Sequence, residues 1–436
     1  MLSRADADLA QRDAALPALA MLLDPSAMTD VLCRSFPEMG AVCAAICYIR
    51  YKPETSCLVG YRLADGAAVP YATAVTYRHD ASVKWANCRD QAAQFVLEDR
   101  GLAISFFPTD AKLRALRLLS DDVGRRRLIA RLASRNPEWW SGTVDVIRYK
   151  PNRRFVGALT AGCERRAVIK AYTPVEFLAA RLTARAFRST DRVKCPAAVG
   201  RSSRRCALAW EWHRGTPLVE LIGRPSWPTT SAAAIGVALA DVHSQNPVGL
   251  PFRRHDDRAH GLVAVAKWLA FVCPPVAARA RHLADRLVQR LANGPISMAA
   301  LHGDCHPGQF LVDGESITAI DFDEAHRGDA SYDLGTFLAH LEAGAIRGHF
   351  PADRAAAVAE AVLGGYRCAA SLPVVEDRIR LQTAAGLLRL AAHPFRSREP
   401  QWPIHTRQML ERAETLLPGG TVRVSATPPR QHHTRS

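Results

Sequence analysis

The chain has few lysines, no paired-cysteine motif and no long apolar run. Only seven of its 57 basic residues are lysine, and the arginines are scattered through an alanine-rich chain. Proteins that bind nucleic acid usually gather their positive charge into a stripe with interleaved aromatic residues. The net charge of +15 is therefore weak support for such a function, and we expect no nucleic-acid partner. No apolar segment reaches the length of a membrane span, so no membrane partner is expected.

The eleven cysteines exclude further classes of protein. They contain no Cys-x-x-Cys pair, and no histidine cluster has zinc spacing, so neither a zinc site nor a redox motif is predicted. Cysteines of this kind are typical of small buried side chains in a reducing compartment, which predicts a cytoplasmic location. The apolar run Ala14–Leu23 ends at Asp24 and follows no basic segment, so it predicts a helix rather than a signal peptide.

Residues 301–312, followed by Ile320–Asp323, carry the most chemical information. Asp304 and Gln309 are five positions apart, and Asp321 lies 17 positions after Asp304. Phosphoryl transfer from Mg-ATP uses this spacing, with a catalytic Asp, an amide side chain and a second Asp that holds the metal. The alternative is an exposed loop followed by an acidic surface strand, which chance would rarely combine with this spacing.

The residues between Gln309 and Asp321 predict a β-hairpin. Two short apolar runs, residues 310–312 and 317–320, flank an Asp-Gly turn at residues 313–316. Such a hairpin would bring Gln309 and Asp321 to one end, where two oxygen ligands can share a hard cation such as Mg²⁺.

The motif resembles the aminoglycoside phosphotransferase and choline kinase group, small-molecule kinases with a protein-kinase-like fold. Their loop reads His-Gly-Asp-x-His-x-x-Asn, then Ile-Asp-aromatic-acidic, then Gly-Asp-Pro-x-x-Asp-Leu, which appears here as residues 328–334. Gln309 replaces the expected Asn, as in the maltokinases of this group. Because glutamine offers the same carbonyl oxygen on a longer stem, metal binding survives chemically. Loss of activity is the competing explanation.

A repeat organises the front half of the chain. The sequence Ile-Arg-Tyr-Lys-Pro occurs twice, at residues 49–53 and at residues 147–151. After it, residues 57–60 are similar to residues 154–157, and residues 71–76 are similar to residues 168–173. Residues 102–107 sit where residues 208–212 do. Two runs of roughly 75 residues therefore share a pattern of hairpin, strand, helix and strand. Chance similarity between unrelated β-rich segments is the alternative.

The second copy resembles the N-terminal lobe of a kinase. In Val168-Ile169-Lys170 the Lys would pair the nucleotide phosphates, with an edge-strand Lys facing water as the alternative. The aligned residue in the first copy is Thr73, which cannot pair a phosphate, so residues 40–120 are predicted to be a non-catalytic duplicate.

No Gly-x-Gly-x-x-Gly loop, which covers the phosphates in protein kinases, occurs in the chain. Arg153 or Arg154 in the turn at residues 150–154 would supply positive charge instead, or the turn is simply solvated. Glu176 is a candidate partner for Lys170, although it lies closer in sequence than the family pattern implies.

A hinge and a helical region complete the resemblance. Residues 207–218 resemble the family's strand-hinge-Gly-x-Pro-Leu segment, so the backbone of Trp210, Glu211 and Trp212 is a candidate for binding adenine; a buried aromatic strand would look identical. Helical periodicity then predicts helices at residues 175–187, 232–242, 262–271, 276–291, 332–341, 355–363, 375–390 and 403–417.

These patterns predict an α+β, bilobal protein-kinase-like fold with a β-rich N-terminal lobe, a helical C-terminal lobe and an additional N-terminal lobe-like cap. The expected units are a cap at residues 1–140, an N-lobe at 141–213, a C-lobe at 214–418 and a disordered tail at 419–436, rich in Pro, Thr, Arg and His. A length of 436 residues fits several domains better than one core.

The resemblance implies a role for each candidate residue. Asp304 would take the proton of a hydroxyl on a small-molecule acceptor, while Gln309 and Asp321 hold Mg²⁺ and Lys170 aligns the phosphates of ATP. The supporting residues would be His302, which braces the loop, Asp333, which accepts its backbone N–H groups, His306, which packs or touches substrate, and Asp323, which assists the metal or is simply exposed.

Three functions stay open. The first is an active small-molecule kinase acting on a sugar, an aminoglycoside or an aminoalcohol. The second is a catalytically weak pseudokinase or a regulatory nucleotide-binding module, with the cap as a surface for a protein partner. The third is a protein kinase, which the absence of His-Arg-Asp, Asp-Phe-Gly and Ala-Pro-Glu disfavours.

Overall fold

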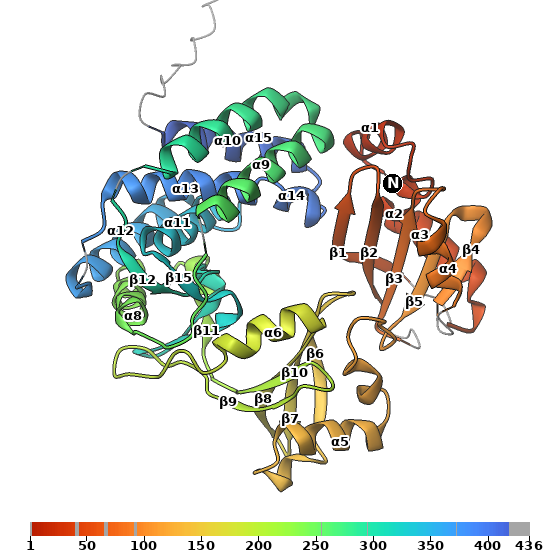
Figure 1. The fold of residues 1–436 in the computed structure, drawn as a ribbon, viewed down its shortest axis with the longest axis horizontal. Coiled ribbons are helices and arrows are strands. Elements are labelled where there is room, and N and C mark those ends of the chain that lie inside the picture. Colours follow the sequence, from red (N-terminus) through yellow and green to blue (C-terminus); the bar gives the residue numbers. More distant parts are fainter. Residues whose placement is uncertain are drawn as a thin grey trace, which may run out of the picture.

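The chain folds into three parts, two of them built on β-sheets and one mainly helical, arranged as a triangle (Figure 1). A computed structural model describes residues 2–39, 43–64, 69–90, 94–253, 255–293, 295–371 and 373–417. The tail predicted to be disordered lies outside the described residues. Within these ranges, no helix combines the length and the apolar character needed to cross a bilayer.

The first unit is a five-stranded antiparallel sheet with helices before and within it. Its strands are paired in the order β1-β2-β3-β5-β4. The strands are β1 (Ala44–Lys52), β2 (Ser56–Leu63), β3 (Tyr71–Tyr77), β4 (Gln94–Leu97) and β5 (Leu102–Phe106), and the helices are α1 (Arg4–Arg12), α2 (Leu19–Leu23), α3 (Pro25–Ser35) and α4 (Ser82–Arg89). The helix predicted at Ala14–Leu23 forms only in its last five residues.

The second unit repeats the strand order of the first. Its sheet runs β6-β7-β8-β10-β9, again antiparallel. The elements are α5 (Asp122–Leu132), β6 (Thr143–Lys150), β7 (Arg154–Ala161), β8 (Glu164–Tyr172), α6 (Pro174–Thr183), β9 (Ala198–Ser202) and β10 (Ala207–Glu211). Helix α6 ends four residues before the predicted end; beyond it the chain turns, and Phe187 stacks on Phe322 with ring centroids 4.5 Å apart.

The strand pairing shows which residues of the two sheets correspond. Tyr51 pairs with Cys57 in the first hairpin of one sheet, and Tyr149 pairs with Phe155 in that of the other, so Leu58 corresponds to Val156. Leu58 pairs with Val75 and Val156 pairs with Lys170, so Val75 and Lys170 occupy equivalent places. The prediction that Thr73 corresponds to Lys170 was therefore wrong by two residues. The prediction that residue 102 corresponds to Leu208 was wrong by one residue, because Ala103 pairs with Val75 as Leu208 pairs with Lys170.

The repeat also extends upstream of the sheets, which the sequence analysis missed. The carboxylate of Asp13 accepts hydrogen bonds from Tyr51 Oη (2.6 Å) and from the backbone N–H of Glu54 (2.9 Å). Asp110 accepts the equivalent bonds from Tyr149 Oη (2.9 Å) and from the N–H of Asn152 (2.7 Å). Glu54 and Asn152 both have positive φ, 54° and 56°, so the two turns are also alike in backbone conformation. Each aspartate thus fastens the chain before its sheet to the first hairpin of that sheet.

This correspondence moves the boundary between the units. Leu113, Leu116, Leu128 and Leu132 share one hydrophobic core with Phe155, Leu159, Ile169 and Ala209 of the second sheet. The predicted boundary at residue 140 was therefore too late, because residues 110–140 pack on the second sheet. The sequence did contain a sign of this, which the prediction overlooked: Asp13, Leu16, Leu19 and Asp24 recur at the same spacing as Asp110, Leu113, Leu116 and Asp121.

The third part is helical and carries two small sheets next to the site described below. Its helices are α7 (Leu218–Ile222), α8 (Ala233–Ser244), α9 (His255–Val272), α10 (Ala277–Leu291), α11 (Ser331–Ile346), α12 (Ala352–Ala369), α13 (Glu376–Leu390), α14 (His393–Arg396) and α15 (Trp402–Thr415). The small sheets pair β11 (Thr216–Pro217), β13 (Phe310–Asp313) and β14 (Ser316–Ala319), and β12 (Met298–Leu301) with β15 (His326–Asp329). Every helix predicted for this region is present.

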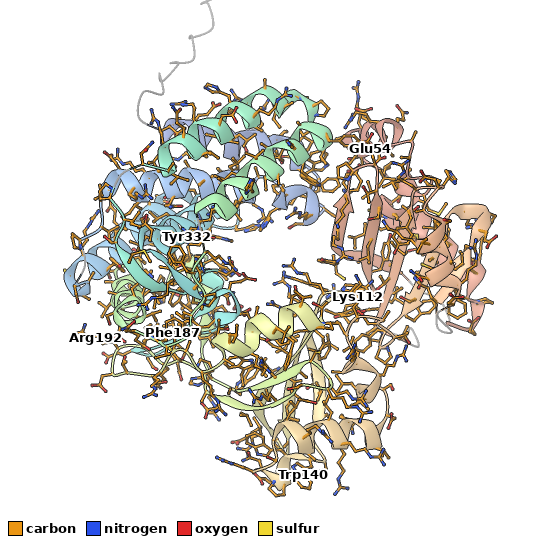
Figure 2. All side chains as sticks on the ribbon, viewed as in Figure 1. Glu54, Lys112, Trp140, Phe187, Arg192 and Tyr332 are labelled. Atoms are coloured by element: carbon orange, nitrogen blue, oxygen red, sulfur yellow. The ribbon has the colours of Figure 1, made fainter. Side chains whose placement is uncertain are left out.

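The first unit is attached to the helical part as well as to the second unit. Arg398 forms an ion pair with the buried carboxylate of Asp6 (2.6 Å), and Trp268 Nε1 donates a hydrogen bond to the carbonyl of Tyr51 (3.2 Å). Tyr51 also contacts the ring of Phe395. Figure 2 marks Glu54 where the first unit approaches the helical part and Lys112 where it approaches the second unit. One hydrophobic core accordingly runs from α1–α3 and the first sheet into α9, α10, α13 and α15.

Candidate active site

The hairpin predicted after Gln309 is present and brings the ends of the motif together. Phe310 on β13 pairs with Ala319 on β14, and the N–H of Ile320 donates to the carbonyl of Gln309 (2.9 Å). Gly314 closes the turn with φ of 58°, a conformation that glycine adopts without steric cost. Asp321 follows β14 with φ of 65°, in the left-handed region. Such a conformation is uncommon for Asp and is often retained at functional sites.

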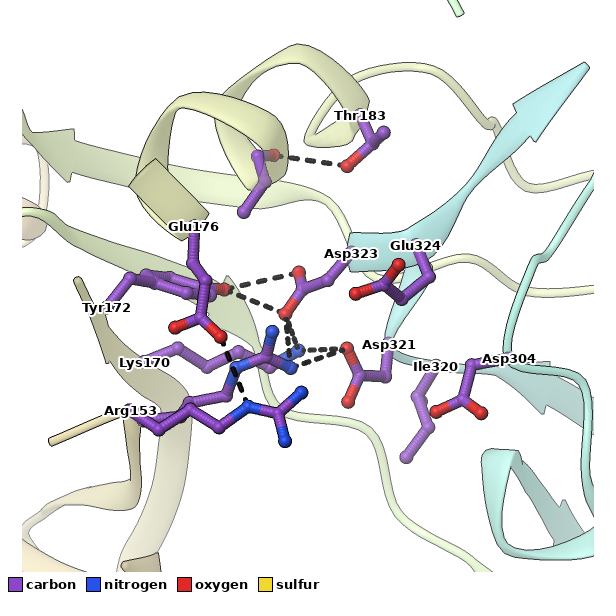
Figure 3. A network of polar contacts seen from close by, with 12 residues as sticks. Arg153, Lys170, Tyr172, Glu176, Thr183, Asp304, Ile320, Asp321, Asp323 and Glu324 are labelled. Carbon is purple, nitrogen blue, oxygen red and sulfur yellow. Dashed lines mark hydrogen bonds and ion pairs between the residues drawn. The ribbon is translucent and has the colours of Figure 1, made fainter. Parts of the chain in front are cut away.

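Lys170, on β8 of the second sheet, contacts the acidic end of this hairpin. Its Nζ atom lies 2.7 Å from Asp321 Oδ1 and 3.3 Å from Asp323 Oδ2. Arg154 on β7 adds a second cation, 3.0 Å from Asp323. The hydroxyl of Tyr172 lies 3.2 Å from both oxygens of Asp323 (Figure 3). The second sheet and the helical part are thus joined by a cluster of two cations and two carboxylates.

Burial and charge act against each other on these carboxylates. Burial favours the neutral form of Asp321, but the charge and hydrogen bond of Lys170 outweigh it and hold the pKa of Asp321 below its usual range. For Asp323 burial dominates over the attraction of Lys170, and the neighbouring charge of Asp321 adds to it, so its pKa is raised to about 6. The pKa of Lys170 is raised because the two carboxylates outweigh the effect of its own burial. Lys170 therefore stays charged, as a phosphate partner must.

Asp304 stands apart from this cluster and is exposed to solvent. In Figure 3 it lies on the side of Asp321 that faces away from Lys170, so Asp321 is located between the two. A carboxylate that is open to solvent, and that forms no ion pair within the described residues, is available to accept a proton from a bound hydroxyl group. The geometry therefore separates a cluster suited to phosphate and metal from a carboxylate suited to an acceptor.

The catalytic loop is braced by a buried aspartate in α11. Asp333 accepts the N–H of His302 (2.6 Å) and the N–H of Gly303 (3.0 Å), the type of contact that the sequence predicted. His243 holds the same carboxylate (3.1 Å), with Tyr366 bonded to its other ring nitrogen (2.8 Å). His302 Nε2 lies 2.8 Å from the carbonyl of Ile320 and so ties the loop to the hairpin. Because these contacts are made by the two residues that precede Asp304, they fix the position of Asp304 in the loop.

Three expectations need correction. Glu176 does not contact Lys170; it pairs with Arg153 (3.2 Å) and accepts a hydrogen bond from the hydroxyl of Thr173, the N-cap of α6, because it sits in the first turn of a helix that begins directly after β8. Asp323 is buried, so its interpretation as an exposed carboxylate was wrong. The turn at residues 150–154 is not simply solvated, since Arg154 extends into the cluster.

The hinge residues lie where predicted, but their backbone is partly engaged. The N–H of Glu211 donates to the carbonyl of Ala197 (3.0 Å) and the N–H of Trp212 to that of Arg166 (3.2 Å). Recognition of adenine through either N–H would require this pairing to change. Trp210 is buried with its ring 5.8 Å from Lys170 Nζ, and its Nε1 has no hydrogen-bond partner in the described part of the chain.

Sequence reasoning missed Lys150, Tyr172 and His243 as members of the site. Lys150 is close enough to Asp304 for the carboxylate to raise its pKa, although burial and nearby arginines lower that pKa to about 8. The sequence contained a signal for it, because lysine is scarce and Lys150 falls in the turn that should cover the phosphates. His243 belongs to a helix segment, Asp241-Val242-His243, that the resemblance had already indicated.

The donor atoms present fit Mg²⁺. Gln309 is buried at the hairpin end beside Asp321, and Asp321 and Asp323 supply carboxylate oxygens. The described residues contain no cluster of three or more His, Cys, Asp or Glu side chains placed to hold a metal alone. Mg²⁺ bound to nucleotides typically uses one or two carboxylates and takes its remaining ligands from phosphates and water. This set therefore suits a metal that arrives with a nucleotide.

Residues 159–378 match the model of a phosphotransferase enzyme family. Similar solved structures include a choline/ethanolamine kinase family protein from Mesorhizobium loti (18% identity, 68% of this chain and 94% of that one, TM-score 0.48). A choline kinase from Streptococcus pneumoniae is 13% identical over 66% of this chain and 98% of that one, with a TM-score of 0.48. A macrolide 2'-phosphotransferase from Brachybacterium faecium is 18% identical over 67% and 98%, with a TM-score of 0.43.

The search of curated proteins found no match. The family model nevertheless spans 220 residues, just over half of the 436-residue chain, and covers the strand with Lys170, the hinge, the catalytic loop and Asp333. With its β-rich lobe next to a helical lobe, the chain has the protein-kinase-like fold and belongs to the phosphotransferase enzyme family.

Proposed function

We propose that the chain transfers the γ-phosphoryl group of ATP to a hydroxyl group of a small molecule. The observation that supports this most is the joining of Lys170 to Asp321 and Asp323 across two parts of the molecule, with the exposed Asp304 beyond Asp321 (Figure 3). Phosphoryl transfer depends mainly on positioning and on charge neutralisation, and these residues offer both.

Each residue has a role in this proposal. Lys170 aligns the phosphates. Lys150 and Arg154, at the two ends of the turn that covers the phosphates, add positive charge. Gln309 and Asp321 hold Mg²⁺, with assistance from Asp323; the metal supplies charge neutralisation when bound. Asp304 orients the acceptor hydroxyl and takes its proton as the new O–P bond forms and the bond to ADP breaks.

The first unit is proposed to be a non-catalytic copy that caps the second. Val75 stands where Lys170 stands in the second sheet, and its apolar side chain, which packs against Leu58 and Cys88, cannot pair a phosphate. It stays a candidate surface for a protein partner, although one of its faces is already used by the helical part. A cytoplasmic location is proposed because ATP is the donor and all eleven cysteines are unpaired.

The test is detection of a new phosphate monoester by ³¹P NMR after incubation with Mg-ATP and a pool of alcohols. Asp304→Asn should keep nucleotide binding and cut turnover by two or more orders of magnitude, as expected for loss of a general base. Asp313→Asn, an exposed aspartate in the hairpin turn, is the matched control and should stay active. Unchanged turnover of folded Asp304→Asn would contradict the assignment. Nucleotide binding without any product would favour a regulatory module instead.

A further inference from the structure

A cavity of about 210 Å³ lies beside the catalytic loop, on the side of the helical part. One wall is the catalytic loop itself, at His306, Pro307 and Gly308. The opposite wall comes from α11 and α14, with His340 and His393. Apolar side chains close the remainder: Val219, Ala343, Phe350, Leu390 and Met409. The volume is several times the ~30 Å³ that one water molecule takes up in the liquid, so a small organic molecule can enter.

The polar groups of this cavity are mainly imidazole rings. His306 stacks on His340 with ring centroids 4.7 Å apart, and His340 lies 6.5 Å from His393 in an edge-on arrangement. His306 Nδ1 accepts the N–H of Gly308 (3.0 Å), which leaves Nε2 as the donor of the neutral ring. Among the described residues, no side-chain or backbone group hydrogen-bonds to the rings of His340 or His393. The cavity therefore presents several ring nitrogens that a ligand can satisfy.

The cavity carries no net charge at neutral pH. Burial lowers the pKa of His306, of His340 and of His349, and it lowers the pKa of His393 to about 4, so the four rings of the lining are neutral. Arg347, the one permanently charged side chain in the lining, is paired with Glu399 outside it. No Asp or Glu of the described residues is part of the lining.

Binding of a cationic acceptor in this cavity would be unfavourable. An ammonium group that leaves water needs a carboxylate or several aligned acceptors in return, and burying it unpaired costs a large free energy. Neutral imidazoles can accept hydrogen bonds, but they supply no negative charge, and the carboxylate of Glu399 is already paired with Arg347. Hydroxyl groups, by contrast, both donate to and accept from such rings, while the apolar wall suits the C–H face of a ring.

We propose that the acceptor is an uncharged polyhydroxyl compound of about monosaccharide size, bound in this histidine-lined cavity. The inference rests on the proposed kinase function and specifies its substrate class. The cavity is next to the reacting group, since Asp304 is two residues before His306 and its charge also reaches His393. A hydroxyl at the mouth of the cavity would thus face Asp304, and the remaining hydroxyls would bind the imidazoles.

Sugar acceptors compared with their positively and negatively charged counterparts test the substrate class. Glucose, galactose and mannose are compared with their 2-amino counterparts and their 6-phosphates, with Mg-ATP at pH 6.5, where the amines are protonated. We expect at least one neutral sugar to have a kcat/KM tenfold or more above both charged counterparts. Equal or better use of an aminated or phosphorylated sugar would overturn the inference. So would turnover of none of the sugars by a chain that binds Mg-ATP. A chain that does not bind Mg-ATP would overturn the kinase function itself, and the acceptor class with it.

Variants test the cavity. His340→Phe keeps a ring of similar size but removes its hydrogen bonds, so the KM for the neutral sugar should rise by tenfold or more while the KM for ATP stays within twofold. His340→Gln, which keeps hydrogen-bonding capacity, should recover part of the loss. His282→Phe on the exposed face of α10 is the control.

If His340→Phe does not fold, saturation-transfer NMR on the unaltered chain replaces the kinetic test. Transfer from the protein to glucose but not to glucosamine supports the inference, and an unchanged sugar KM in folded His340→Phe, or the reverse transfer preference, contradicts it.

Discussion

Pro151 in the second unit packs directly against Gly60 in the first, so closely that a Cβ atom at Gly60 would lie 3.0 Å from Pro151 Cγ. Pro151 belongs to the turn between β6 and β7, which covers the proposed phosphate site. The first unit therefore supports this turn from outside, and Asp110 holds the same turn through the N–H of Asn152. A turn with no glycine-rich segment is positioned here by a neighbouring domain.

Gly60→Val should displace this turn. The added side chain would meet both Pro151 and Tyr48, and overpacking of this kind typically costs about 1–3 kcal/mol of stability. We expect the KM for ATP to rise several-fold while the acceptor KM changes little, measured by steady-state kinetics on folded protein. Gly261→Ala, where a Cβ meets nothing within 4 Å, is the control. A Gly60→Val protein with an unaltered KM for ATP would show that the first unit does not position the turn.

Lys150 should give nucleotide use a characteristic pH dependence. Burial, reinforced by nearby arginines, lowers the pKa of its ammonium group to about 8. As pH rises through this value the side chain loses its positive charge, so the attraction for phosphates decreases. The kcat/KM for Mg-ATP, which reports the free enzyme, should therefore fall above about pH 8.

Lys150→Arg keeps its charge throughout this range and should remove the decline, because arginine is not deprotonated in proteins. Lys112→Arg makes the same chemical change on an exposed side chain and should leave the wild-type profile. If Lys150→Arg and the unaltered chain decline alike, another group is responsible for the titration.

Gln309 should act through its amide oxygen. Gln309→Asn retains that oxygen on a shorter stem and should keep partial activity, whereas Gln309→Leu should require much higher Mg²⁺ concentrations. Titration of activity against Mg²⁺ at saturating ATP separates the two variants. The same Mg²⁺ response in both would mean that Gln309 never touches the cation.

The sequence predicted the site more fully than the arrangement of the domains. Asp304, Gln309 and Asp321 were identifiable because a catalytic loop fixes their spacing along the chain. The Asp-Gly turn at residues 313–316 made the hairpin equally predictable. The contacts of Asp333 with His302 and Gly303 followed from the family motif. All of these are local relationships or recur in a known motif.

What the sequence did not predict depends on contacts between distant segments. Arg154 was one of two candidates in its turn until the fold brought it to Asp323. Asp13 and Asp110 were overlooked although the residues after them repeat at the same spacing, and their bonds to a tyrosine and a backbone N–H appear only in the folded chain. Glu176 was assigned to Lys170 by sequence proximity, although the position of a helix-starting residue is set by the packing of the whole helix. The histidine-lined cavity combines residues from five separate segments.

Only the second of the two equivalent units should bind a nucleotide. Val75 and Lys170 hold equivalent places, and within the described residues Lys170 faces an acidic pair whereas Val75 packs in an apolar cluster. Titration calorimetry with a non-hydrolysable ATP analogue and Mg²⁺ tests this directly, with Val75→Ala and Lys170→Ala as matched variants. We expect one nucleotide per chain, unchanged by Val75→Ala and weakened at least tenfold by Lys170→Ala. Two nucleotides per chain, or equal affinity in folded Lys170→Ala, would contradict this expectation.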